Sequence, residues 1–289
     1  MNLVLATHRE SPGLSPSDTL LARALESRGV PVTSAPWDSI EPAGAPDQCV
    51  CLRSTWDYHL RAPEFRAWVS GFRAGPDRLW NPPDTVLWNL DKDYLRGLER
   101  QGIPLPITHW LPAGEAPDPG ALFRATGWRL AVLKPRVSAS AHGTILVTPE
   151  TALSGEDAAR LSRSGALWQE FIPEIRTRGE ISLMFFGGEF SHAVCKQVAP
   201  GEFRVQPHLG GEARRIDAAP ELRAFGARVL RAVPARWVYA RVDVVHAERG
   251  PVLMELELVE PELFFHLAPE RADHLAECLA GLVGQNSRR

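Results

Sequence analysis

The chain has 289 residues, 44% hydrophobic residues and a formal net charge of −3, which is ordinary for a globular protein of about two domains. The small charge gives no general reason to expect nucleic acid or an anionic membrane as a partner, so any anion-binding region must be a local cluster. The start of the chain lacks a secretory pattern and no run of about 18 apolar residues occurs, so we expect a cytoplasmic protein; homo-oligomerisation stays open.

Lysine is rare in this chain. Of its 32 basic residues only three are lysines, namely Lys92, Lys134 and Lys196. Since arginine serves wherever a generic surface cation would do, each lysine is a candidate for a site that needs a compact point charge. Base composition of the gene could produce the same excess of arginine, but it would scatter the lysines at random. Their positions therefore test the two interpretations.

The first part of the chain alternates strands and helices. Residues 3–8 and 48–53 read as apolar strands, and 17–29 reads as a helix with Ser17 as N-cap. This order predicts a parallel, helix-covered sheet, in which ligands bind beyond the carboxyl ends of the strands. Four polar residues that follow the second strand are candidates for substrate binding or, alternatively, for capping and solvating the loop: Arg53, Ser54, Asp57 and Tyr58.

A proline-containing segment then leads into a predicted helix over 90–103, with Asn89 as its N-cap. Lys92 falls in the first turn, where a cation opposes the helix dipole at a cost of a few tenths of a kcal/mol. Either the neighbouring Asp91 and Asp93 or a bound phosphate would compensate for that cost.

Two apolar strands, 130–134 and 144–148, follow, joined by the small-residue loop "VSASAHG". Lys134 ends the first of them. The loop offers backbone N–H groups with little side-chain bulk, which suits a flap over phosphates. The alternative is an ordinary mobile loop.

The rest of the chain reads as hairpins. Residues 166–173 form a predicted strand, and 179–196 form a hairpin around Gly187-Gly188 with Glu180 on its polar face and Lys196 at its end. The loop over 200–213 adds a cation, Arg204.

The stretch from 237 to 257 reads as a further hairpin. A three-residue turn that ends at Gly250 is a favoured connection, and it pairs Ala247 with Pro251. Residues two apart share a face. This register predicts one polar and one apolar face: Arg241, Asp243, Glu255 and Glu257 on the first, and Val242, Val244, Met254 and Leu256 on the second.

Facing carboxylates repel each other across a bare sheet. A divalent cation would remove this objection, and an all-oxygen set of ligands from Asp243, Glu255 and Glu257 suits Mg²⁺ or Mn²⁺ better than Zn²⁺. The alternative is a wet sheet face with an Arg241–Glu257 pair. Glu260 and Glu262, on either side of Pro261, are expected in a loop near the rim of the site.

Six motifs in this order resemble the ATP-grasp superfamily of carboxylate-amine ligases, and in particular its glutathione-synthetase-like members. They are Lys92, Lys134 before the small-residue loop, "QEFI", Glu180, "HAVCK…EFRVQPHLGG" and "ARVDVV…LMELELVEP". The phrases "LRSTWDYH", "WNLDKDYL" and "ELELVEPELFF" are similar to a bacterial subgroup that contains the cycloserine-forming cyclo-ligase.

The resemblance implies an α/β fold (α+β lobes) with a parallel N-terminal lobe, 1–90, and two lobes that clamp ATP, 91–172 and 173–289. It implies ATP contacts at Lys92, Lys134, Ser138, Ser140, Gly143, Glu170, Phe171, Ile172 and Glu180. It assigns Asp243, Glu255 and Glu257 to two Mg²⁺ ions, with Glu255 bridging them. It assigns the transferring phosphoryl group and the tetrahedral intermediate to Lys196, Arg204 and Arg241. Two positions depart from the family pattern, because Glu257 and Gln206 each stand where asparagine is usual.

The implied activity is an ATP- and Mg²⁺-dependent ligase that activates a small, amino-acid-like carboxylate as an acyl-phosphate for attack by an amine of the same or another molecule. No Ser-His-Asp or Cys-His nucleophile is needed for this reaction. Two alternatives remain from the sequence: a kinase that passes the γ-phosphate to a hydroxyl, and a non-catalytic nucleotide-binding protein.

Overall fold

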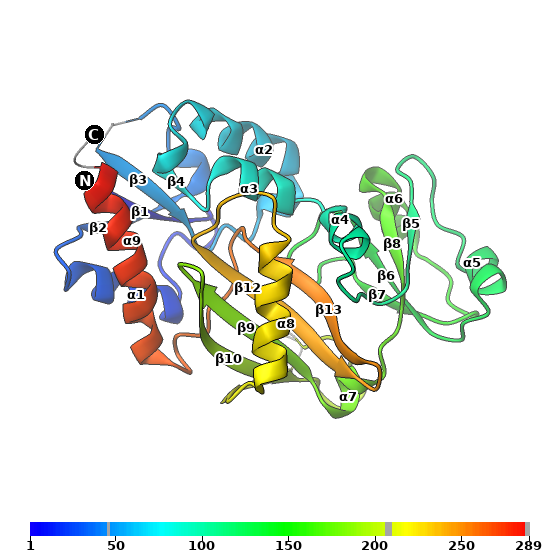
Figure 1. Cartoon of the computed structure of the whole chain (residues 1–289). Coiled ribbons are helices and arrows are strands. Elements are labelled where there is room, and N and C mark those ends of the chain that lie inside the picture. Colours follow the sequence, from blue (N-terminus) through cyan, green and yellow to red (C-terminus); the bar gives the residue numbers. More distant parts are fainter. Residues whose placement is uncertain (45–46, 206–209, 287–289) are drawn as a thin grey trace.

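Three β-sheets organise the part of the chain that the structure, a computed structural model, describes: residues 1–44, 47–205 and 210–286. Figure 1 shows the N-terminal sheet and the sheet of β5 to β8 at opposite ends of the molecule, with the longest strands between them. Among the described helices, none has both the length and the apolar character needed to cross a bilayer.

The first sheet is parallel, with the strand order β2-β1-β3-β4, as the sequence predicts. Its strands and surrounding helices are β1 (Asn2–Thr7), α1 (Pro16–Glu26), β2 (Val32–Pro36), β3 (Gln48–Leu52), α2 (Ala62–Gly71), β4 (Leu79–Trp80) and α3 (Pro83–Asn89). The N-cap of α1 is Ser15, not the expected Ser17, and its side chain accepts a hydrogen bond from the backbone N–H of Asp18 at 3.1 Å. Pro16 then occupies the first turn, where its missing N–H costs nothing.

The second sheet is antiparallel, with the order β5-β8-β6-β7. This part of the chain comprises α4 (Tyr94–Arg100), β5 (Thr108–Leu111), α5 (Pro119–Thr126), β6 (Ala131–Pro135), β7 (Ile145–Val147), α6 (Gly155–Ser164) and β8 (Ala166–Glu170). β6 and β7 pair with Leu133 opposite Ile145. The predicted hairpin around the small-residue loop is therefore confirmed.

The segment around Lys92 differs from the prediction of one helix over 90–103. Helix α3 ends at Asn89 and α4 starts at Tyr94, so Asn89 is no N-cap. Its side-chain amide instead donates to the backbone oxygen of Leu256 at 2.9 Å. Lys92 lies in the turn between the two helices, directly before Asp93, the N-cap of α4.

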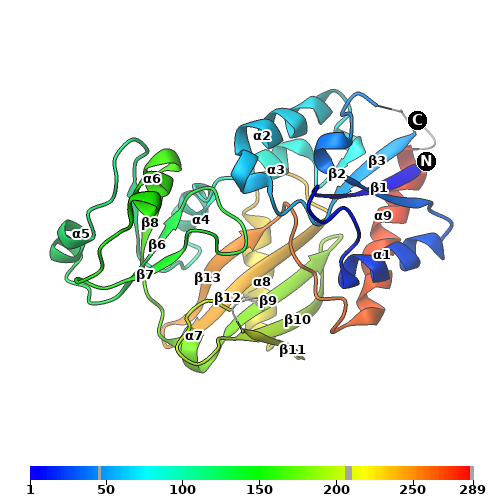
Figure 2. The ribbon, with the colours of Figure 1, turned by 180° about the vertical axis from the view of Figure 1, so that it is seen from behind.

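The third sheet is antiparallel, with the order β11-β10-β9-β12-β13. This part comprises α7 (Glu174–Thr177), β9 (Glu180–Phe186), β10 (Glu189–Gln197), β11 (Glu212–Ile216), α8 (Pro220–Arg231), β12 (Tyr239–Ala247), β13 (Gly250–Glu257) and α9 (Ala272–Asn286). Helix α8 covers one face, with Phe225 and Val229 packed in one core with Leu183 and Val242 (Figure 1). The other face is turned to the viewer in Figure 2, where α9 packs beside α1 at the end of the molecule.

The turn between β12 and β13 is tighter than the sequence predicts. Ala247 pairs with Gly250, where the prediction pairs it with Pro251. Only residues 248 and 249 remain in the turn, and Gly250 begins the second strand with a φ of 99°. A uniform ladder from this turn would place every acidic residue of β13 one position away from its expected partner.

A β-bulge corrects this offset. Val244 lies opposite Leu253 whereas Asp243 lies opposite Glu255, so Met254 is an extra residue in β13. The pairs beyond the bulge are the expected ones: Asp243 with Glu255 and Arg241 with Glu257.

The bulge also reverses the side chain of Met254. The alternation of the strand predicts it on the apolar face with Val242, but Met254 lines the same cavity as Glu255 and packs near Val245 and Val252. Consecutive residues 254 and 255 therefore both face the site, which a regular strand does not permit.

Candidate active site

A cavity of about 490 Å³ lies between the second and third sheets. Strands β6, β8, β9, β12 and β13 contribute to its walls, together with the 138–144 loop and residues of the 56–58 and 259–264 segments. All three lysines of the chain line this cavity, and Lys92, Lys134 and Lys196 are only 6%, 8% and 5% exposed. The point-charge interpretation predicts that the lysines converge on one site, whereas random placement does not.

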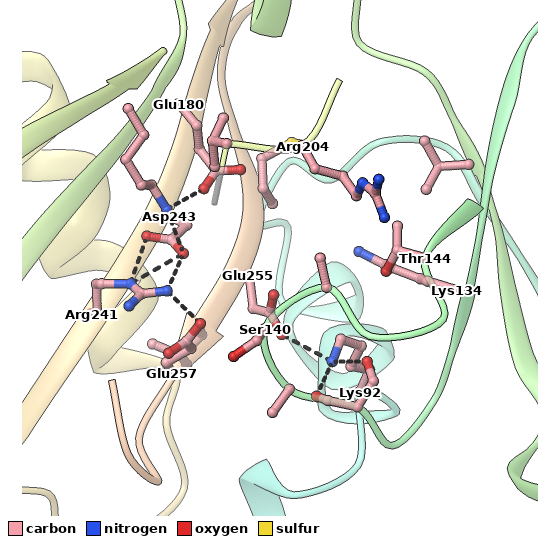
Figure 3. Close-up of a pocket in the computed structure, with 18 of the residues that line it drawn as sticks. Lys92, Lys134, Ser140, Thr144, Glu180, Arg204, Arg241, Asp243, Glu255 and Glu257 are labelled. Carbon is pink, nitrogen blue, oxygen red and sulfur yellow. Dashed lines mark hydrogen bonds and ion pairs between the residues drawn. The ribbon is translucent and has the colours of Figure 1, made fainter. Parts of the chain in front are cut away.

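Carboxylates and cations alternate across one wall of the cavity (Figure 3). Lys92 Nζ lies 3.0 Å from an oxygen of Glu255. Arg241 makes ion pairs with both Asp243, at 3.0 Å, and Glu257. Lys196 Nζ lies 2.5 Å from Glu180 and 3.4 Å from Asp243. These contacts reduce the repulsion between the facing carboxylates of β12 and β13.

The acidity of these groups reflects both burial and their partners. Burial by itself would raise the pKa of Asp243, but Arg241 and Lys196 outweigh it and hold that pKa at about 2. Burial raises the pKa of Glu257 to about 8 against the effect of Arg241, since Glu255 and Asp243 add to the rise. An additional cation at this wall would therefore be electrostatically favourable.

The donor set of this wall fits a hard divalent cation. Asp243, Glu255 and Glu257 supply only oxygen, and the described residues that line the cavity include no His or Cys. In the ranges that the structure describes, no three acidic, His or Cys side chains converge at coordinating distance; Lys92 and Arg241 pair with Glu255 and Glu257 instead.

The small-residue loop closes over the cavity from the second sheet. Lys92 Nζ donates to the backbone oxygen of Ser138 at 3.0 Å and to its hydroxyl at 3.1 Å. Ser138 and Ser140 line the cavity, whereas Gly143 does not. Gly143 has a φ of 72°, and a Cβ there would lie 2.8 Å from a side-chain carbon of Arg160, so its role is to let the loop turn.

Lys134 is a buried cation without a partner in the part of the chain that the structure describes. Its side chain lines the cavity at the end of β6. Burial lowers the pKa of Lys134 to about 8. An ammonium group in this position is free to bind an anionic ligand.

The end of β8 and the start of β9 also contribute to the cavity. Glu170, Phe171, Ile172 and Glu180 all line the cavity. The carboxylate of Glu170 is bound by Arg249 at 2.8 Å. Val132, Gln169 and Met254 also line the cavity and were not expected there from the sequence.

Comparison with known proteins agrees with this arrangement. A family model described as a RimK-like ATP-grasp domain matches residues 129–263, and one described as the N-terminal domain of D-cycloserine synthetase DcsG matches residues 3–81. The crystal structure of D-cycloserine synthetase DcsG superposes with a TM-score of 0.82 at 26% identity, covering 98% of this chain and 100% of that one. This chain belongs to the ATP-grasp ligase family.

Two relatives of the ATP-grasp ligase show how far the similarity reaches. The cycloserine biosynthesis protein DcsG of Streptomyces lavendulae is 27% identical in an alignment 288 positions long, which covers 90% of this chain and 91% of that protein. A protein of Serratia proteamaculans (strain 568) named "Probable alpha-L-glutamate ligase" is 34% identical over 169 residues, which are 57% of this chain and only 55% of that protein. The likeness to cycloserine biosynthesis proteins thus spans both the first lobe and the ATP-grasp domain.

In the ATP-grasp ligase, Arg204 also lines the cavity. It is held by Glu202, with 2.8 Å between the guanidinium and the carboxylate. The neighbouring departure from the family pattern, Gln206, lies outside the described residues.

Three of the four residues expected to bind substrate in the first lobe do not line the cavity of the ATP-grasp ligase. Arg53 is 1% exposed and pairs with Asp18 at 2.7 Å, and Ser54 donates to the same carboxylate at 2.8 Å. Asp57 accepts a hydrogen bond from the indole of Trp37 at 2.8 Å. These contacts organise the loop, and the alternative that they cap and support it is the one that the geometry favours.

Tyr58, the fourth of these residues, does line the cavity. The cavity is also lined by Trp56 and Phe264, which the sequence did not single out, and by the two glutamates expected near the rim, Glu260 and Glu262. Glu260 is more deeply buried than a rim residue, at 6% exposure, and burial raises its pKa to about 7.

Proposed function

We propose that this ligase uses ATP and Mg²⁺ to convert the carboxylate of a small, amino-acid-like molecule into an acyl-phosphate, which an amine then attacks to form a C–N bond. The observation that carries the proposal is the wall of β12 and β13. There Asp243, Glu255 and Glu257 share one face with Arg241, and all four line a cavity that also contains every lysine of the chain.

The nucleotide is assigned to the region between the second and third sheets. The phosphates would be held by the ammonium groups of Lys92 and Lys134 and by the loop residues Ser138 and Ser140. Glu170 to Ile172 and Glu180 would hold adenosine, while Gly143 shapes the loop. The proposed lobes are 1–90, 91–172 and 173–289, with ATP between the second and the third.

The metal would be held by Asp243, Glu255 and Glu257. When bound, Mg²⁺ supplies charge that offsets the negative charge of the phosphates. The protein contributes Lys196, Arg204 and Arg241, whose positive charges stabilise the transferring phosphoryl group and the oxyanion of the tetrahedral intermediate.

The proposed reaction has two steps. An oxygen of the substrate carboxylate attacks the γ-phosphorus, and the bond to the β–γ bridging oxygen breaks to release ADP. The amine then attacks the acyl carbon, the C–O bond to phosphate breaks, and inorganic phosphate and a proton leave. Water would hydrolyse the acyl-phosphate, so the loop held over the cavity by Lys92 and Ser138 has a second use in excluding it.

One experiment separates this ligase from a small-molecule kinase and from a binding protein. The protein is incubated with Mg-ATP and a panel of amino acids, with and without hydroxylamine. Ligase chemistry gives carboxylate-dependent ADP release and a hydroxamate. ADP release with a stable phosphorylated hydroxyl would instead identify a kinase, and absence of turnover would leave a binding protein.

Glu180→Ala is expected to raise the KM for ATP about 10-fold or more, with a smaller effect on kcat. The substitution removes an acceptor from the assigned ribose position and leaves Lys196 with Asp243 as its remaining partner, and a hydrogen bond to a charged group contributes about 1.5–3 kcal/mol. Steady-state kinetics with varied ATP measure this. An unchanged KM for ATP would show that β9 does not face the nucleotide.

The kcat/KM for ATP is expected to fall as pH rises above about 8. The pKa of Lys134 is about 8, so Lys134 is positively charged at lower pH and loses its charge at higher pH. The pH dependence of kcat/KM reports the ionisation of groups in the free enzyme. Lys134→Arg keeps its charge and should flatten the profile. A fall of the same size in Lys134→Arg would assign the titration to another group.

A further inference from the structure

One carboxylate of the cavity lacks a counterion. Glu260 is 6% exposed and lines the cavity next to the 56–58 segment. Within the described residues its side chain has neither a hydrogen bond nor an ion pair. Burying a carboxylate without a partner is costly, so this position is unfavourable unless a ligand completes it.

The two arginines whose charges act most strongly on Glu260 already have other partners. Arg241 pairs with Asp243 and Glu257. Arg53 pairs with Asp18 and donates to the backbone oxygen of Pro261 at 2.7 Å. The described part of the chain therefore provides the electrostatic surroundings of Glu260 but no direct partner.

The neighbouring Glu262 shows what a satisfied carboxylate looks like in this segment. One of its oxygens accepts from the hydroxyl of Ser17 at 2.6 Å and from the backbone N–H of Phe264 at 2.7 Å. Glu262 is thus engaged in holding the 259–264 segment, whereas Glu260 is not.

The surroundings of Glu260 suit an organic cation. Trp56, Tyr58 and Phe264 line the same cavity, and the charge of Glu260 acts on the phenol of Tyr58. Aromatic faces attract ammonium groups.

We propose that Glu260 binds the ammonium group of the acid that is activated, so that the substrate is an amino acid or another carboxylic acid with a cationic nitrogen. This rests on the proposed ligase function and deepens it. Glu260 anchors the substrate by its nitrogen beside Tyr58 and Trp56, while Arg241 and the β12–β13 wall receive its carboxylate.

The test uses matched pairs of acids with Mg-ATP and hydroxylamine as the amine. Each pair is an amino acid in its D or L form and its desamino counterpart: alanine and propionate, serine and 3-hydroxypropionate, glutamate and glutarate. ADP release and hydroxamate formation are measured for the wild type, for Glu260→Gln and for Glu189→Gln, a control in the β9–β10 hairpin that is exposed and lies outside the cavity.

The wild type is expected to prefer the amino member of at least one pair by about 10- to 100-fold in kcat/KM, since this is the range of a hydrogen bond to a charged group. Glu260→Gln should reduce that preference to less than about threefold while the KM for ATP stays unchanged. Because the substitution removes an unpaired buried charge and keeps the shape of the side chain, thermal unfolding should show no loss of stability.

The outcomes that overturn the proposal are distinct. Equal use of amino and desamino acids by the wild type, or a preference that Glu260→Gln retains, would overturn the role of Glu260 and leave the ligase function intact. Absence of ADP release with every acid would contradict the ligase function itself and, with it, this assignment. Loss of the preference in Glu189→Gln as well would show that the effect is not specific to Glu260.

Discussion

Glu255→Gln is expected to lower kcat by about 10³-fold or more at saturating Mg²⁺, because a metal site contributes several kcal/mol of transition-state stabilisation. Glu255 faces Asp243 across the hairpin and is the carboxylate that Lys92 contacts at 3.0 Å. In the proposed function it would be one of the three carboxylates that hold Mg²⁺, and an amide is a much weaker ligand for Mg²⁺ than a carboxylate.

The structure also indicates that this variant should fold. Glutamine has nearly the shape of glutamate, and its side-chain oxygen can still accept the hydrogen bond of Lys92. Circular dichroism and thermal unfolding check the fold, and ADP release measures the turnover. Glu99→Gln, an exposed residue of α4, is the matched control and should keep wild-type activity. A Glu255→Gln enzyme with near-normal kcat would remove the metal assignment of this wall.

Arg53→Met is expected to lower the free energy of unfolding by about 3–5 kcal/mol, since removal of one member of a buried ion pair leaves the other charge uncompensated. Arg53 and Asp18 have side chains only 1% and 2% exposed. The same guanidinium donates to the backbone of Pro261, so the variant should also loosen the segment that carries Glu260.

Urea unfolding measures this change. Arg73→Met removes an arginine from a surface pair with Asp84, whose side chains are 59% and 72% exposed, and should cost at most about 1 kcal/mol. If Arg53→Met were as stable as the wild type and only raised the KM for the acid, Arg53 would have the substrate-binding role that the sequence also allowed.

The sequence predicted the architecture well because the relevant signals are local. Alternating apolar residues and capping residues specify individual strands and helices, and their order distinguishes a parallel sheet from the later hairpins. The scarcity of lysine was a further local signal, and all three lysines lie in one cavity. The order of the motifs was sufficient to recognise the ATP-grasp family.

The residues around Lys92 show where local signals fail. A polar residue before an apolar pattern is typical of an N-cap, but Asn89 ends a helix and hydrogen-bonds the backbone of β13, a strand 167 residues away in sequence at Leu256. No pattern within the segment carries information about that partner.

The sequence by itself determined which residue types are available: three lysines, a run of acidic residues in β13, and strands of the right length to bring them together. Only the tertiary structure decided which of them form the site. The bulge at Met254 compensates for a turn that is one residue tighter than predicted. The ion pair with Asp18 holds Arg53 away from the cavity. Glu260 is buried without a partner among the described residues. Each of these depends on contacts between segments far apart in the chain, because burial and ion pairing are properties of the folded surroundings and not of the strand that carries the residue.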